Sequence, residues 1–153
     1  MPAIWPLIPI FAFLLQNAGV PPVPADALSP DETARLEKEV NVERRIKVYE
    51  EASARIQQSL VTAVNKEDFQ TVPDRLKAWT TLLTKSLQDI ETNLKAKNKS
   101  KQLIKYEIQL RKSIATMQGY KIKAPADLQD DFDACSAQAE KVRKRFVEIL
   151  FPR

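Results

Sequence analysis

The chain has 153 residues and a net charge of +4, with 44% hydrophobic and 29% charged residues, and it contains no histidine and one cysteine. The length fits one domain, and the residue balance is that of a folded protein rather than a disordered one. The missing histidine argues against haem, against histidine-containing metal sites and against catalytic systems built on histidine, and the small net charge gives little support for nucleic-acid binding.

Residues 1–25 contain no charged side chain and include an apolar run from Ile4 to Leu15. The run has about the length of a signal-peptide core and is shorter than the roughly 20 residues that a spanning helix needs. Small residues at the end of this segment predict cleavage after Ala25. We therefore expect an export signal over 1–25, a single helical-bundle domain over 26–153, and a periplasmic or secreted protein.

Two features of this segment leave alternatives open. No Lys or Arg precedes the apolar run, and Pro6 and Pro9 interrupt it. Residues 4–20 could instead anchor the uncleaved protein in a membrane. A third interpretation is an apolar arm that packs on the protein's own core.

The first helix has a clear start signal. Ser29 is a suitable N-cap, Pro30 suits the first helical position, and Glu32 completes the pattern of a capping box. Farther along, apolar and small residues recur at spacings of four and three, which is typical of one buried helix face. These residues are Val42, Ile46, Tyr49, Ser53, Ile56, Leu60 and Ala63.

Three more amphipathic segments follow. Pro73 and Pro125 predict helix starts, and Gly119 predicts a helix end. Four such helices with short connections predict an all-α fold, an antiparallel up-down-up-down four-helix bundle. The apolar stripes are Leu76, Thr80, Leu83, Leu87, Ile90 and Leu94, then Leu103, Tyr106, Leu110, Ile114 and Met117, then Leu128, Phe132, Cys135, Ala139, Val142, Phe146 and Ile149.

The first helix and the last turn raise a packing question. Leu36 and Val40 lie off the main stripe, so the first helix is either long or changes register near Asn41. The last turn, "RFVEILFPR", is apolar on more than one face. We expect it to pack under the start of the first helix, near Leu36 and Val40. The alternative is a docking surface for a second copy or another protein, with Phe151 as an anchor.

The fourth helix contains the residues that are most suggestive of chemistry. Cys135 lies in its apolar stripe and is predicted to be a buried, inert thiol, the alternative being a reactive or dimer-linking one. Asp127, Asp130, Asp131 and Asp133 suit the positive end of the helix dipole. A Ca²⁺ site is the alternative, but the spacing of an EF-hand is missing. We assign no metal, cofactor or catalytic residue.

Positive charge is concentrated in two segments. The stretch between Glu91 and Glu107 contains lysines and no acid, and the fourth helix ends in a basic run. An antiparallel bundle brings both segments and the N-terminal lead to one end, which we call the basic end. Solubility and helix-dipole complementation are the simpler explanation. The predicted contact set is Lys95, Lys97, Lys99, Lys101, Arg143, Lys144 and Arg145, with Phe151 as an apolar anchor.

The sequence thus favours a small exported protein without enzymatic activity. We expect it to bind an unidentified protein or an anionic membrane or envelope surface through the basic end, and not nucleic acid. The alternative is a structural module of the cell envelope that forms homo-oligomers through the first helix or the C-terminal turn. An enzyme that uses carboxylates alone is a third, weaker hypothesis.

Overall fold

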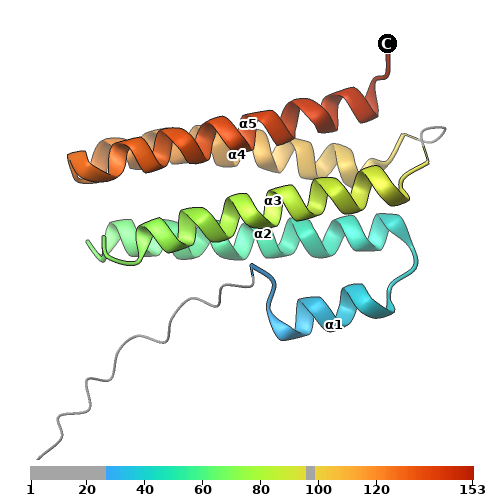
Figure 1. Ribbon diagram of the computed structural model, residues 1–153, viewed down its shortest axis with the longest axis horizontal. Coiled ribbons are helices and arrows are strands. Elements are labelled where there is room, and N and C mark those ends of the chain that lie inside the picture. Colours follow the sequence, from blue (N-terminus) through green and yellow to red (C-terminus); the bar gives the residue numbers. More distant parts are fainter. Residues whose placement is uncertain (1–26, 96–98) are drawn as a thin grey trace, which may run out of the picture.

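The computed structural model describes residues 27–95 and 99–153, and the regular structure in these residues is helical (Figure 1). The segment 1–25, with its predicted export signal or anchor, lies outside the described residues. Among the described helices, none combines the length and apolarity that crossing a membrane requires. The elements are α1 (Pro30–Lys38), α2 (Val42–Asn65), α3 (Val72–Asn93), α4 (Lys101–Lys123), the 3-10 helix η1 (Ala126–Leu128) and α5 (Gln129–Leu150).

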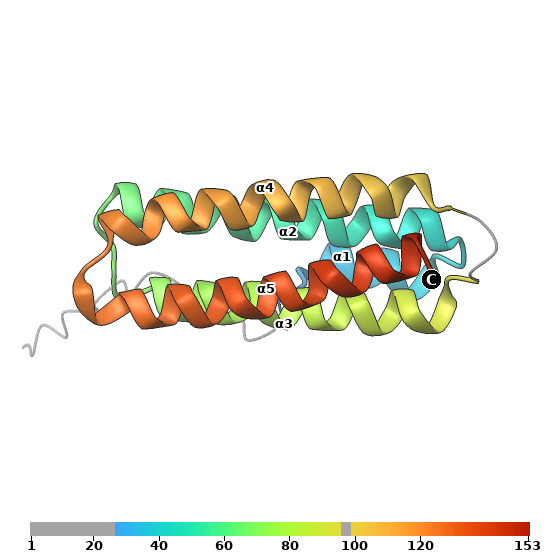
Figure 2. The same cartoon turned by 90° about the horizontal axis from the view of Figure 1, so that it is seen from above.

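The predicted helical bundle is confirmed. The four long helices lie side by side, and each packs against two neighbours: α2 against α3 and α4, and α5 against the same two (Figures 1 and 2). The shorter α1 packs against α2. The end of α3, the start of α4 and the end of α5 lie at one end of the molecule (Figure 2). The described residues of the basic segments, Lys95, Lys99 and Lys101 beside α3 and α4 and the basic run of α5, therefore lie toward this end.

The core lies between the four long helices and contains the predicted apolar stripes except for Thr80, which is half-exposed and lines a surface groove. Its largest fully buried side chains include Tyr49, Trp79, Tyr106, Phe132 and Phe146. Most polar side chains inside this core are paired, as buried donors and acceptors usually are, although Gln109 Oε1 is buried without a hydrogen-bond partner. The indole Nε1 of Trp79 donates a hydrogen bond to Ser53 Oγ at 2.9 Å, and the hydroxyls of Ser86 and Tyr106 lie 3.1 Å apart.

The predicted capping box at the start of the first helix is present. Ser29 Oγ accepts a hydrogen bond from the backbone N–H of Glu32, whose carboxylate accepts one from the N–H of Ser29. Arg55 of α2 donates two further hydrogen bonds to this carboxylate. Burial raises the pKa of Glu32, but the hydrogen bonds from Arg55 and Ser29 outweigh it, so the pKa lies below its usual range. Glu32 therefore binds α1 to α2 as a carboxylate.

The sequence predicted that the first helix is long or changes register near Asn41. In the structure the helix ends completely before Asn41, and the chain turns back there. Helix α1 ends at Lys38, and Asn41 begins α2 by accepting a hydrogen bond from the backbone of Arg44 at 3.1 Å. Leu36 is buried, but Val40 in the connection is 93% exposed. The expectation that the C-terminal turn covers Val40 is therefore wrong. Leu36 and Val40 share a helical stripe only if the helix continues, and it does not.

The place where the N-terminal lead joins the bundle also differs from the prediction. The carbonyl oxygen of Ala27 accepts a hydrogen bond from Arg55 Nη2 at 2.9 Å, so Ala27 lies beside the middle of α2. Arg55 follows Val42 by more than three helical turns, or about 20 Å along the axis. The prediction that the lead enters at the basic end is wrong, because α1 folds back along α2.

The predicted helix end at Gly119 is also wrong. Helix α4 continues through Gly119 to Lys123, and the extended residue Ala124 ends it. Ala124 precedes Pro125, and a residue before proline is driven out of the helical region by a clash with the ring. The proline is therefore the stop signal, and Gly119 is an ordinary exposed helical position.

Replacing Gly119 with alanine should raise the free energy of unfolding by about 0.5–1 kcal/mol, because glycine is a poor helix former. A Cβ at this position meets no atom within 4 Å, so no clash offsets the gain. Urea denaturation followed by circular dichroism measures the change. The reciprocal control is Ala115→Gly at another exposed position of α4, which should lower stability by a similar amount. A lower stability of Gly119→Ala would contradict the prediction.

Candidate functional site

The connection between α3 and α4 carries three of the predicted contact residues. Lys95 follows α3, Lys99 precedes the N-cap of α4, and Lys101 is the first residue of α4; all three are exposed. Lys97 lies outside the described residues. The buried Ser100 lies between Lys99 and Lys101 and fixes the backbone there, since its Oγ accepts a hydrogen bond at 3.0 Å from a backbone N–H in the first turn of α4.

These lysines form no ion pair within the described part of the protein. No described carboxylate lies within ion-pairing distance of Lys95, Lys99 or Lys101. Lys99 and Lys101 lie at the N-terminus of α4, where the helix dipole is positive and favours anions. This helix has no acid in its first turn. Helix stabilisation therefore does not explain these two lysines, and the dipole adds to their positive potential.

Two other members of the predicted contact set form ion pairs within the bundle. Arg143 of α5 lies 3.0 Å from a carboxylate oxygen of the buried Glu107 in α4 and 2.6 Å from one of Glu140. Hydrogen bonds to both carboxylates raise its pKa. Arg145 lies 2.7 Å from Glu91 of α3. Both guanidinium groups link neighbouring helices, and we leave them out of the candidate site.

The C-terminal residues complete the basic end. Lys144 is exposed and forms no ion pair with the residues that the structure describes. Phe151, just after α5, is 55% exposed, and Lys99 Nζ lies 5.1 Å from the centre of its ring, a cation–π distance. The C-terminus and the α3–α4 connection therefore meet at one surface. The candidate site consists of Lys95, Lys99, Lys101, Lys144 and Phe151.

Val40 is an exposed apolar residue of this end, although the sequence predicted that it would be covered. The α1–α2 connection that contains it lies at the same end of the molecule as the C-terminus (Figure 2). Its charged and polar neighbours, Glu39 and Asn41, were the available signal of an exposed connection. The helical stripe with Leu36 concealed that signal.

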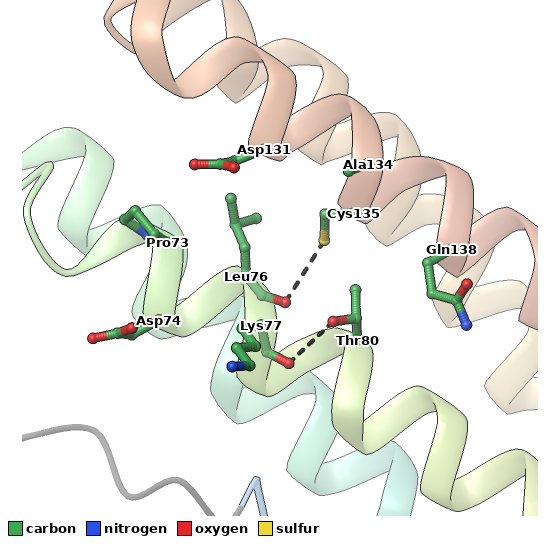
Figure 3. A pocket seen from close by; sticks show the side chains of 9 residues that line it. All are labelled: Pro73, Asp74, Leu76, Lys77, Thr80, Asp131, Ala134, Cys135 and Gln138. Atoms are coloured by element: carbon green, nitrogen blue, oxygen red, sulfur yellow. Dashed lines mark hydrogen bonds between the residues drawn. The ribbon is translucent and has the colours of Figure 1, made fainter.

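Cys135 lines an open groove between α3 and α5 that has a volume of about 370 Å³ (Figure 3). Cys135 Sγ lies 3.8 Å from the carbonyl oxygen of Leu76, and Thr80 Oγ1 donates to a carbonyl of its own helix. Cys135 is buried, as predicted, and burial raises the pKa of its thiol to about 12. A thiol with this pKa is protonated at neutral pH and is a poor nucleophile.

The aspartates of η1 and of the start of α5, at positions 127–133, gain no support as a metal site. Asp133 pairs with Lys121 at 2.7 Å. Within the described residues, no group of three or more histidine, cysteine, aspartate or glutamate side chains lies close enough together to hold a metal ion. The helix-dipole explanation of these acids is therefore the simpler one.

Comparison of the chain with models of known protein families, with curated proteins and with solved structures gives no match. Within the described residues, the most informative feature for function is therefore the set of exposed lysines at the basic end that have no ion-pair partner.

Proposed function

We propose that this protein is a small exported helical bundle without enzymatic activity, which binds an anionic surface through its basic end. Helices α2–α5 would form an antiparallel up-down-up-down four-helix bundle, an arrangement that their short connections support. Export through residues 1–25 stays a prediction, with membrane anchoring by residues 4–20 as its alternative.

The observation that supports binding is the placement of exposed lysines without ion-pair partners. Lys95, Lys99 and Lys101 lie within seven consecutive positions around the α3–α4 connection, and two of them lie at a helix N-terminus. A lysine near an anionic membrane surface contributes about 1 kcal/mol of binding free energy. Three such residues are enough for measurable, salt-sensitive association.

The proposal of a non-enzymatic role follows from the available side chains. The chain lacks histidine, and its one thiol is buried with a raised pKa. The buried tyrosine hydroxyls are also held in the core: Tyr106 contacts Ser86, and burial raises its pKa. None of these groups is placed at a surface where a substrate would meet it.

The test compares the full chain with a triple variant, Lys95→Gln, Lys99→Gln and Lys101→Gln, in co-sedimentation with vesicles of equal parts phosphatidylcholine and phosphatidylglycerol. We expect the triple variant to bind about 100-fold more weakly, because about 1 kcal/mol is lost per lysine. Vesicles of phosphatidylcholine alone should bind neither protein.

A matched control makes the same change of net charge elsewhere. Lys66, Lys77 and Lys123 are exposed and lie toward the other end of the bundle. Replacing these three with glutamine should have a much smaller effect, because screening confines electrostatic attraction to about 10 Å. Equal losses in the two triple variants would show that net charge alone drives binding, and unchanged binding by the first would refute the proposed function.

A further inference from the structure

We infer that the surface bound by the basic end is a lipid bilayer, and that Val40 and Phe151 insert beneath its headgroups while the lysines contact the phosphates. This inference rests on the proposed function and adds the class of ligand. An acidic polymer would satisfy the lysines equally well, but it offers no apolar interior to the two exposed side chains.

Val40 is held outward by a fixed backbone. On one side, the N–H of Glu39 donates to Arg35 O at 3.1 Å, and on the other Asn41 caps α2. Arg45 Nη1 also donates to the carbonyl oxygens of Leu36 and Glu39, at 2.5 and 2.8 Å. A 93% exposed valine in such a connection is a preformed apolar protrusion. It loses little conformational freedom on insertion, which favours binding.

Phe151 is the second apolar protrusion, and its ring contacts one of the lysines. Its ring is 55% exposed and lies beside the ammonium group of Lys99, which is 5.1 Å from the ring centre. Aromatic rings with an adjacent cation are suited to the membrane interface, where the ring enters the apolar layer and the cation remains among the headgroups.

Acidic side chains near Val40 have partners within the protein. Glu39 accepts a hydrogen bond from the backbone of Asn41, and Glu43 accepts one from the backbone of Gln102 at 2.9 Å. Glu39 also lies 3.9 Å from Arg44. These contacts reduce the repulsion that their charges would exert on anionic lipid.

The charges at this end also argue against a second copy as the occupant. A symmetric dimer through Val40 and Phe151 would place the two sets of Lys95, Lys99 and Lys101 near one another, and like charges brought together in an interface oppose association. An anionic bilayer offers the complementary charge and an apolar layer below it.

The test uses Val40→Ser and Phe151→Ser in the full chain, with the same anionic vesicles and with soluble polyglutamate as a polyanion without an apolar phase. Each substitution should weaken vesicle binding by roughly tenfold, since it removes the gain from burying an apolar side chain. Binding to polyglutamate should not change. The matched control is Ile122→Ser, because Ile122 is 80% exposed in the last turn of α4, far from this end.

The outcomes separate this inference from the proposed function. If the lysine triple variant loses vesicle binding but Val40→Ser and Phe151→Ser bind like the parent, the surface is anionic but nothing inserts, and the inference fails alone. If the lysine variant binds like the parent, the proposed function fails. A molecular mass that rises with concentration in the parent and not in Phe151→Ser would identify a second copy as the occupant and overturn the inference.

Discussion

Replacing Asp89 with alanine should lower the free energy of unfolding by about 3 kcal/mol at neutral pH. Asp89 of α3 is 11% exposed at its side chain and accepts hydrogen bonds from Arg45 Nη2 and from the hydroxyl of Tyr49, each at 2.6 Å. Removing one partner of a largely buried pair leaves the other charge uncompensated, which costs several kcal/mol. Chemical denaturation followed by circular dichroism measures the loss.

The effect of Asp89 should depend on pH in a defined direction. Burial raises the pKa of Asp89, but the hydrogen bonds from Arg45 and Tyr49 outweigh it and hold the pKa below its ordinary value of 3.8. A lowered pKa stabilises the folded state above the unfolded-state pKa, and this contribution is lost as the pH falls through the folded-state pKa. The stability difference between parent and Asp89→Ala should therefore be full near neutral pH and shrink below about pH 4.

A surface ion pair provides the control for this prediction. Arg35 and Glu51 lie 2.8 Å apart, and both side chains are more than two-fifths exposed. Glu51→Ala should change stability by less than about 1 kcal/mol, because exposed pairs contribute little. If the two alanine variants were equally stable, the Arg45–Asp89 contact would be no more than a surface pair.

The second large effect is expected at Trp79, whose replacement by alanine should cost about 4 kcal/mol. Its side chain is fully buried in α3, and removing a large aromatic group leaves a cavity that the packed helices fill only in part. The same denaturation experiment applies. The variant should also unfold with a broader or earlier thermal transition if the cavity loosens the core.

Two milder variants separate the volume of Trp79 from its hydrogen bond. Trp79→Phe keeps most of the ring area but leaves Ser53 Oγ without the indole donor, which should cost about 1–2 kcal/mol. Ser53→Ala should cost a similar amount, because the buried indole N–H loses its acceptor. A loss in Trp79→Phe as large as that in Trp79→Ala would mean that the hydrogen bond, and not the packing, dominates.

Local sequence signals predicted the helices well, and the reason is physical. The Ser29 capping box depends on residues three apart, and the stripe from Val42 to Ala63 reflects a single helix period. Such features are decided within a few residues, so the sequence displays them directly. The buried position of Cys135 followed from the same periodicity.

Features that depend on distant contacts were not predictable in the same way. The fold-back of α1 is fixed by Arg55, which binds the carbonyl group of Ala27 and the carboxylate of Glu32, more than 20 residues away along the chain. Arg45 adds hydrogen bonds to the carbonyl groups of Leu36 and Glu39 across the α1–α2 connection. Nothing in the local pattern shows that a charged residue will turn inward. The same limit applies to Arg143, whose pairing with Glu107 across two helices looks in the sequence like part of a basic run.

The candidate site was predicted only in part for this reason. The exposed lysines around the α3–α4 connection lie where the sequence placed them, because a short polar connection between two helices is seldom buried. The cation–π contact between Lys99 and Phe151 joins residues that are far apart in sequence, so periodicity alone does not reveal it.

The antiparallel docking of α1 also determines how the protein would respond to a mechanical load on the chain ahead of Ala27. The contacts of α1 and the residues that flank it follow one another along α2: Arg55 with Ala27, then Glu51 with Arg35, then Arg45 with the carbonyl of Glu39. A force applied to the chain before Ala27 would load the α1–α2 pair at that end, so the contacts would break one after another rather than together. Helix α1 would then peel away at low force while α2–α5, which share the main core, stay packed.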